Sequence, residues 1–261
     1  MLDATVHQLI AEELAEAERT RVPAKLFTKR YPDMVVEDSY AVQRIWRDAR
    51  VARGRRIIGH KIGLTSRAMQ QATGITEPDY GVIFDDQVFE SGAVIEHARY
   101  TGVRVEVELA FVLGAPLSGP NVTVHDVLRA TEYVVPALEI LDSRIEMEGR
   151  SIVDTISDNA ALGAMVLGGT PAAPESVDLR WQAAMLYKNE VIEETGVAGG
   201  VLGHPAAGVA WLANRLAPHG ERLEAGEVIL GGSFTRPVWA HPGDTLHAEY
   251  QGLGAVTCRF V

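Results

Sequence analysis

One stretch decides the fold of this chain: Arg104-Val105-Glu106-Val107-Glu108-Leu109-Ala110-Phe111-Val112-Leu113. Its alternation of polar and apolar residues has the period of a β-strand, which places Glu106 and Glu108 on one face together with Arg104. Same-face neighbours stand roughly 7 Å apart, or less where side chains converge. Two carboxylates beside an apolar core raise each other's pKa or attract a cation, and a hard divalent ion prefers such oxygen ligands. The alternative is an amphipathic strand whose glutamates face solvent.

The composition of the 261-residue chain, 47% hydrophobic and 23% charged, is typical of one large globular domain or two modest ones. A formal net charge of −11 argues against a nucleic-acid partner, which requires a basic face. An anionic small-molecule substrate stays compatible, because a metal or a few basic groups can make one pocket positive. The single cysteine, Cys258, excludes an intrachain disulfide and a cysteine-based metal cluster.

The sequence carries no signal for export or membrane insertion. Acidic residues begin at Asp3, which does not match the pattern of a signal peptide. No apolar run approaches the ~20 residues that span a bilayer. We therefore expect a cytoplasmic protein without a membrane partner.

The first third of the chain is predicted to be mostly helical. A capping box at Thr5-Val6-His7-Gln8 starts the first helix, and the second begins near Glu37-Asp38-Ser39, whose acids suit a helix N-terminus. Helical spacing predicts two buried stripes: Val6, Ile10, Leu14 and Ala17, then Ala41, Ile45, Ala49 and Ala52. A short helix is predicted from Ser66 to Ala72, followed by a loop from Gly74 to Tyr80.

Strands dominate after residue 94, interrupted by one clear helix that begins at His204-Pro205. Besides 104–113, strands are predicted at 55–63, 81–84, 133–141, 160–167, 181–187, 190–195, 228–230, 245–250 and 255–260. Pro136 suggests an edge or a bulge. Helices gather early and strands late, which favours an α+β protein. We expect a single domain over 1–261, mostly helical in 1–80 and β-rich in 81–261.

A third acidic residue, Glu139, stands between Leu138 and Ile140 in the most apolar predicted strand. An unpaired carboxylate is costly there. Together with Glu106 and Glu108 it forms a three-carboxylate set that suits octahedral Mg²⁺. The alternative is a salt bridge from Glu139 to an arginine such as Arg104 or Arg144.

Two ionisable residues lie in the segments before residue 80. Lys61 follows His60 in an apolar strand bounded by glycines, where a lysine can supply positive charge or a proton. The alternative for Lys61 is a side chain that reaches solvent from a strand end. Asp79 follows Pro78 in a predicted loop, where it either serves function or caps a turn.

The loop Gly231-Gly232-Ser233-Phe234-Thr235-Arg236-Pro237 follows a predicted strand. Its glycines let backbone approach a ligand, Ser233 and Thr235 offer hydroxyls, and Arg236 can pair with a carboxylate. The alternative is a tight turn with a surface arginine. A second polar loop, 154–159, is expected to border the same pocket. Serine-hydrolase, zinc-protease and P-loop motifs are missing from the sequence.

These segments together resemble a known family. Gly59-His60-Lys61-Ile62-Gly63-Leu64-Thr65-Ser66, Glu77-Pro78-Asp79-Tyr80-Gly81 and Arg104-Val105-Glu106-Val107-Glu108 resemble the hydratase and decarboxylase branch of the fumarylacetoacetate hydrolase superfamily. The segments 154–159 and 229–238 resemble members of that branch that act on a seven-carbon diacid. The resemblance extends over nearly the whole chain.

The resemblance implies a mixed β-roll of the fumarylacetoacetase C-terminal type behind an N-terminal helical part. It also implies Mg²⁺, or Mn²⁺, held by Glu106, Glu108 and Glu139, and a homo-oligomer, with large rings among the forms expected. The implied reaction adds water to 2-oxo-hept-4-ene-1,7-dioate in homoprotocatechuate breakdown and yields 4-hydroxy-2-oxoheptanedioate. Lys61 would stabilise or protonate the enolate, and Asp79 would orient Lys61 or a water, or carry a proton.

Arg236 is the candidate partner for the C7 carboxylate of this small anionic 2-oxo dienoate, with Ser233 and Thr235 beside it. The alternatives at the same metal are a 4-oxalocrotonate decarboxylase and a 2-hydroxypentadienoate hydratase. A different class is a non-catalytic scaffold or ligand-binding subunit. The role of Arg104 stays open between a counter-charge to the glutamates and a contact to substrate.

Overall fold

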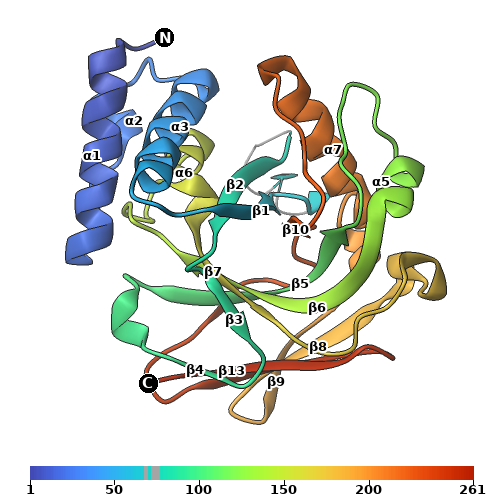
Figure 1. The fold of residues 1–261 in the computed structure, drawn as a ribbon. Coiled ribbons are helices and arrows are strands. Elements are labelled where there is room, and N and C mark those ends of the chain that lie inside the picture. Colours follow the sequence, from blue (N-terminus) through green and yellow to red (C-terminus); the bar gives the residue numbers. More distant parts are fainter. Residues whose placement is uncertain (68–69, 72–76) are drawn as a thin grey trace.

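The structure is a computed structural model that describes residues 1–67, 70–71 and 77–261 (Figure 1). Its α-helices are α1 (Ala4–Thr20), α2 (Phe27–Arg30), α3 (Val36–Ala52), α5 (Val124–Ala130), α6 (Ile152–Ser157) and α7 (Ala206–Leu216). Its strands are β1 (Ile57–Gly63), β2 (Asp79–Phe84), β3 (Val88–Glu90), β4 (Ala93–Ile95), β5 (Val103–Leu113), β6 (Thr131–Asp142), β7 (Leu162–Leu167), β8 (Ala183–Lys188), β9 (Val191–Val197), β10 (Val228–Leu230), β11 (Val238–Trp239), β12 (Thr245–Tyr250) and β13 (Gly254–Phe260). The fold is α+β, as predicted.

The strands form two mixed sheets. The eight-stranded sheet has the order β2-β1-β10-β5-β6-β7-β3, and β11 also pairs with β5. The five-stranded sheet has the order β4-β13-β12-β8-β9 and lies below it in Figure 1. Most pairs are antiparallel, whereas β1–β10, β3–β7 and β4–β13 are parallel. The long strands β5 and β6 run through the centre of the larger sheet and curve strongly (Figure 1).

The main hydrophobic core lies between the two sheets, and β5 contributes one complete face to it. Val105, Val107 and Phe111 are fully buried, as the period-two pattern predicts. They share one cluster with Leu246 and Phe260 of the smaller sheet. Because this face of β5 is committed to the core, the glutamates must project from the other face.

The N-terminal helices α1 and α3 pack together at one side of the larger sheet, and Phe84 of β2 belongs to their core cluster (Figure 1). The capping box predicted at Thr5 is wrong, because Asp3 is the N-cap and accepts a hydrogen bond from the Thr5 N–H. The first predicted stripe is confirmed at Ile10, Leu14 and Ala17, while Val6 is only partly buried.

The stripe predicted for the second helix is displaced. Helix α3 begins where expected, but Ala49 and Ala52 are exposed, and its buried residues are Asp38, Ser39, Tyr40, Val42, Gln43 and Trp46. The buried face of α3 therefore carries aromatic and polar side chains such as Tyr40, Gln43 and Trp46, and not the predicted alanines. The interhelical contact includes a hydrogen bond between His7 Nε2 and Asp38 Oδ1 of 2.8 Å.

Three further expectations differ from the structure. Pro136 lies in an interior strand, one residue outside the β6–β7 register that runs from Ala137 to Leu141. The predicted 154–159 loop is largely helix α6, which Ser151 caps. Asp79 begins strand β2 and so lies outside a loop.

The expected seam near residue 80 falls within β2, and β1 before it belongs to the larger sheet. The helix predicted over 66–72 and the start of the 74–80 loop lie partly outside the described residues. Within the described part of the chain, no helix is long and apolar enough to cross a membrane.

Candidate metal centre and its cavity

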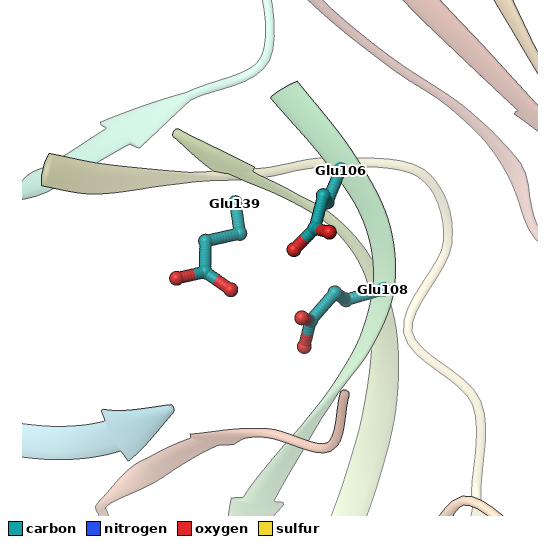
Figure 2. Close-up of side chains that lie close together, drawn as sticks. All are labelled: Glu106, Glu108 and Glu139. Carbon is teal, nitrogen blue, oxygen red and sulfur yellow. The ribbon is translucent and has the colours of Figure 1, made fainter. Parts of the chain in front are cut away.

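Three carboxylates converge where β5 and β6 pair. Glu106 lies directly opposite Glu139 in the antiparallel register, and Glu108 follows on the same face of β5. One oxygen from each residue lies within 4.8 Å of the other two. Figure 2 shows all three side chains directed into one common space. Glu108 and Glu139 are completely buried, and Glu106 is half-buried.

The hydrogen bonding of this triad is incomplete. The N–H of Gly232 donates to Glu108 Oε2 at 2.8 Å. Among the described residues, Glu108 Oε1 and both oxygens of Glu139 accept no hydrogen bond, although the Lys61 ammonium lies 3.2 Å from Glu139 Oε1. Buried carboxylate oxygens normally have hydrogen-bond partners, so oxygens without them are suited to coordinating a cation. An all-oxygen set of this kind fits a hard divalent ion.

The mutual repulsion of the triad agrees with this assignment. Burial, followed by the charge of Glu139, raises the pKa of Glu106 from 4.5 to about 7. The same two causes hold the pKa of Glu108 well above its ordinary range. A divalent cation would reverse both shifts by favouring the ionised forms.

Lys61 reaches the triad from β1. Its Nζ lies 3.2 Å from Glu139 Oε1, and the residue is only 3% exposed. Burial opposes the charged amine, but the carboxylates, Glu139 first, outweigh burial and raise the pKa of Lys61. The side chain is therefore a charged group inside the site, and the alternative of a solvent-reaching lysine is wrong.

Asp79 joins the site from β2, where it pairs with Gly63 of β1. It is 1% exposed, and burial raises the pKa of its carboxyl despite the nearby charge of Lys61. A Cβ atom at Gly63 would stand 2.1 Å from Asp79 Oδ1 and 3.1 Å from Lys61 Nζ. Glycine at position 63 therefore lets both functional groups enter the site.

The glycine-rich loop lies against β5 and holds it in place. Ser233 Oγ donates to the Thr235 carbonyl at 2.9 Å, and the Val107 N–H donates to Thr235 Oγ1 at 3.2 Å. Gly232 has φ +117°, and a Cβ there would meet Thr65 Oγ1 at 2.2 Å. Only glycine combines this conformation with the N–H contact to Glu108.

A cavity of about 510 Å³ opens over Glu106 and is lined by the predicted loop residues Ser233, Thr235 and Arg236. Arg236 is 79% exposed in its side chain and pairs with Glu194 of β9 through Nε and Nη2, at 2.8 and 2.6 Å. Glu194 was not predicted, because nothing in its local sequence distinguishes it from the other glutamates of an exposed strand.

Other candidates lie elsewhere. Arg144 pairs with Asp158 in a fully buried ion pair, so the alternative of a salt bridge from Arg144 to Glu139 is wrong. Asp154 receives hydrogen bonds from Thr28 of α2. The cavity over Glu106 has no lining residue from 154–159, so the expectation that this segment borders the pocket is also wrong. His60 faces away from the triad and lies 3.6 Å from Glu227.

The fold and the acidic triad define a class: metal-binding enzymes with a curled mixed β-sheet and helices at one side. The sequence profile described as "Fumarylacetoacetate (FAA) hydrolase C-terminal" matches residues 56–261. The chain therefore belongs to the fumarylacetoacetate hydrolase family, and the resemblance seen in the sequence is confirmed.

Curated relatives are enzymes of the hydratase and decarboxylase type. The chain is 54% identical, over all of both sequences, to the 2-oxo-hept-4-ene-1,7-dioate hydratase of Escherichia coli. It is 40% identical to the 2-keto-4-pentenoate hydratase of Paraburkholderia xenovorans (strain LB400), covering 96% of this chain and 93% of the relative.

Among solved structures, the 4-oxalocrotonate decarboxylase from Pseudomonas putida G7 in complex with magnesium and adipate superimposes with a TM-score of 0.97. It is 37% identical, and the superposition covers 100% of this chain and 99% of that chain. A second structure of that enzyme, with calcium and acetate, gives a TM-score of 0.96 at 37% identity, covering 100% of this chain and 99% of that chain.

Proposed function

We propose that this protein is a metal-dependent hydratase that adds water to 2-oxo-hept-4-ene-1,7-dioate and forms 4-hydroxy-2-oxoheptanedioate. The observation that carries the proposal is the meeting of the Glu106–Glu108–Glu139 triad with Lys61 and Asp79, beside a cavity that Glu106 lines. The full-length identity of 54% to a hydratase of this substrate supports the choice of reaction.

The triad would hold Mg²⁺, with Mn²⁺ as a second possibility that the same oxygen set allows. When bound, such an ion acts as a Lewis acid toward a 2-oxo acid and supplies positive charge. The chain contributes the fixed positions of the ligands: the β5–β6 register aligns Glu106 with Glu139, and the Gly232 N–H orients Glu108.

Lys61 acts as a proton donor and as a charge that stabilises the enolate. Its raised pKa keeps the amine protonated at neutral pH, so it supplies a fixed positive charge beside the developing enolate and is not a general base. Asp79 is suited to carrying a proton in both directions. Its raised pKa and buried Oδ1, which no described residue satisfies, suit a carboxyl that accepts and returns protons.

In the proposed sequence, these two residues first move a proton to set up the unsaturated 2-oxo acid. Water then adds at C4, and the product is heavier than the substrate by one molecule of water. Ser233, Thr235 and Arg236 are candidate substrate contacts because they line the cavity. The hydroxyls also hold the loop to Val107, between the two glutamates of β5.

The test is an assay of the purified chain with Mg²⁺ and the seven-carbon dienoate. Loss of the diene absorbance, abolished by a chelator, together with a product that has gained one water by mass, would support hydration. Lack of turnover of this substrate with Mg²⁺ or Mn²⁺ would refute the proposal.

A second candidate reaction, decarboxylation at the same metal, is favoured by the TM-score of 0.97 to a 4-oxalocrotonate decarboxylase. The two reactions differ in the product, because decarboxylation of a 2-oxo-enedioate releases CO₂. Mass analysis of the same reaction mixture therefore separates them.

We also propose that the protein works in the cytoplasm, in the breakdown of aromatic compounds, as a homo-oligomer. Support for self-association comes from the edge strand β9, whose Val191 and Ile192 are 62% and 50% exposed. Light scattering of the purified chain tests this, and a monomeric mass at micromolar concentration would contradict it.

A further inference from the structure

Strand β2, which begins at Asp79, is the terminal strand of the eight-stranded sheet. Strand β1 pairs with one edge of β2 and sets Gly63 opposite Asp79. In the described part of the chain no strand pairs with the other edge, although every residue of β2 is buried. Buried backbone N–H and C=O groups need hydrogen-bond partners, so side chains must supply them along this outer edge.

Two side-chain amides occupy the outer edge next to Asp79. Gln43 of α3 donates from Nε2 to the Tyr80 carbonyl at 2.8 Å. Asn159 pairs with Val82 as a neighbouring strand would, because its Oδ1 accepts from the Val82 N–H at 2.8 Å and its Nδ2 donates to the Val82 carbonyl at 2.9 Å. The two amides therefore hold β2 at the first and the third residue after Asp79.

Asn159 reaches β2 from an unusual backbone turn. Asn159, Ala160 and Ala161 have φ of 50°, 52° and 57°, so three successive residues with a Cβ atom adopt the left-handed conformation. Asparagine tolerates this conformation, whereas alanine rarely adopts it. The three residues are only 1%, 2% and 2% exposed. Backbone strain of this kind persists only where the surrounding structure enforces it, and it gathers at functional sites.

The left-handed turn fits closely against β2. A Cβ atom at Gly81 would stand 2.4 Å from the Asn159 carbonyl oxygen and 3.2 Å from Asn159 Oδ1. Glycine at position 81 therefore admits the turn. Gly81 is also the register partner of Lys61 on β1, so the turn supports β2 at the point where this strand lies against Lys61.

We propose that the left-handed turn at 159–161, together with Gln43, positions Asp79 beside Lys61 by holding the outer edge of β2. The cavity over Glu106 is lined by neither Asn159 nor Gln43, so both residues act through the strand. This inference rests on the proposed function for the role of Asp79 as a proton carrier. It also assigns a task to Asn159, the last residue of the segment 154–159.

The test measures kcat and KM with Mg²⁺ and the seven-carbon dienoate in two variants. Asn159→Gly tolerates the left-handed backbone but removes both hydrogen bonds to Val82, and Gln43→Met removes the donor to Tyr80 at similar side-chain length. We expect kcat of the folded protein to fall by about 10- to 100-fold in each, the range for a reacting group displaced by about 1 Å. KM and the Mg²⁺ dissociation constant should change by less than about 3-fold, because the triad and the cavity stay intact.

The matched control is Gln87→Met. Gln87 Oε1 accepts a hydrogen bond from the Phe84 N–H at 3.0 Å, so Gln87 holds the same strand at the end far from Asp79. Loss of this hydrogen bond should lower the midpoint of thermal unfolding as in the two variants, with kcat of the folded protein unchanged. If Asn159→Gly does not fold, Gln43→Met and this control carry the kinetic comparison.

Hydrogen exchange of the metal-free protein gives a readout that is independent of turnover. The Val82 amide proton should exchange at least about 10-fold faster in Asn159→Gly than in the wild type, because its acceptor is gone. If this difference is present but the wild type does not hydrate the dienoate, the turn is supported as the anchor of β2 and only the proposed function fails.

Three results would overturn the inference. One is a lower unfolding midpoint with normal kcat in the folded fraction of both variants, which is the signature of a purely structural role. Another is a loss of kcat in Gln87→Met as large as in the two variants. The third is an unchanged exchange rate of the Val82 amide in Asn159→Gly.

Discussion

Replacing Glu106 with glutamine should move the stability of the metal-free protein and its response to metal in opposite directions. The carboxylate of Glu106 is repelled by Glu139 in the absence of a cation, and glutamine has nearly the same shape without the charge. Glu106→Gln should therefore stabilise the metal-free protein while removing one ligand. Hydratase activity should fall by at least about 100-fold, since the set of ligands is incomplete.

The magnitude follows from the pKa of Glu106, which is raised from 4.5 to about 7. In this pH interval the folded protein binds more protons than the unfolded chain, so the stability of the wild type falls as the pH rises. Above pH 7 the loss approaches about 3 kcal/mol at 1.36 kcal/mol per pKa unit. Solvent screening of the half-buried side chain reduces this to about 2–3 kcal/mol.

The assay is urea or thermal unfolding of both proteins, in chelator and in Mg²⁺, between about pH 4 and pH 8. In chelator at about pH 8 the variant should be more stable by about 2–3 kcal/mol, or roughly 4–12 °C in Tm. The difference should vanish below about pH 4.5, where both states of the wild type are protonated. Mg²⁺ should stabilise only the wild type. A variant that is less stable in chelator, or equally stabilised by Mg²⁺, would refute the reasoning.

Three further predictions concern residues around the triad. Lys61→Met should lower kcat by about 10²- to 10⁴-fold while Mg²⁺ still raises the unfolding midpoint, and a near-normal rate would exclude Lys61 from the chemistry. Gly232→Ala should lose about 2–5 kcal/mol of unfolding free energy, because its φ of +117° and the 2.2 Å approach to Thr65 Oγ1 both oppose a Cβ. A loss below about 1 kcal/mol in urea would show that Thr65 moves aside. Asp158→Asn should destabilise by about 3–5 kcal/mol, since Arg144 would remain buried and unpaired, with kcat unchanged in the folded fraction.

Several features of the fold and the site could be predicted from local sequence. The alternation in 104–113 predicted β5 and its two faces, because side chains on a strand alternate whatever the strand pairs with. An acidic residue between Leu138 and Ile140 marked Glu139 as a group that needs a partner. The glycines at 231–232 predicted a backbone that can approach a ligand closely, which stays a prediction; in the structure the Gly232 N–H donates to Glu108.

Helix α6 and the buried face of α3 were not predictable to the same degree. In α6, a run of six residues is too short for a clear helical period, and Asp154 serves as the partner of both Ser151 and Thr28. In α3, packing against α1 and β2 placed Trp46 inside and left Ala49 at the surface. Tertiary contacts override a weak local pattern in such cases.

The sequence by itself determined which residues carry charge in apolar surroundings, and therefore the chemistry of the site. Only the tertiary structure decided which of those charges meet. The β5–β6 register set Glu106 opposite Glu139, and β2 brought Asp79 beside Lys61. The same folding paired Arg236 with Glu194, whereas Arg104 stacks on Trp239 and forms no ion pair within 4 Å among the described residues. The physical reason is that periodicity is a property of adjacent residues, whereas an ion pair depends on the registers of strands far apart in the chain.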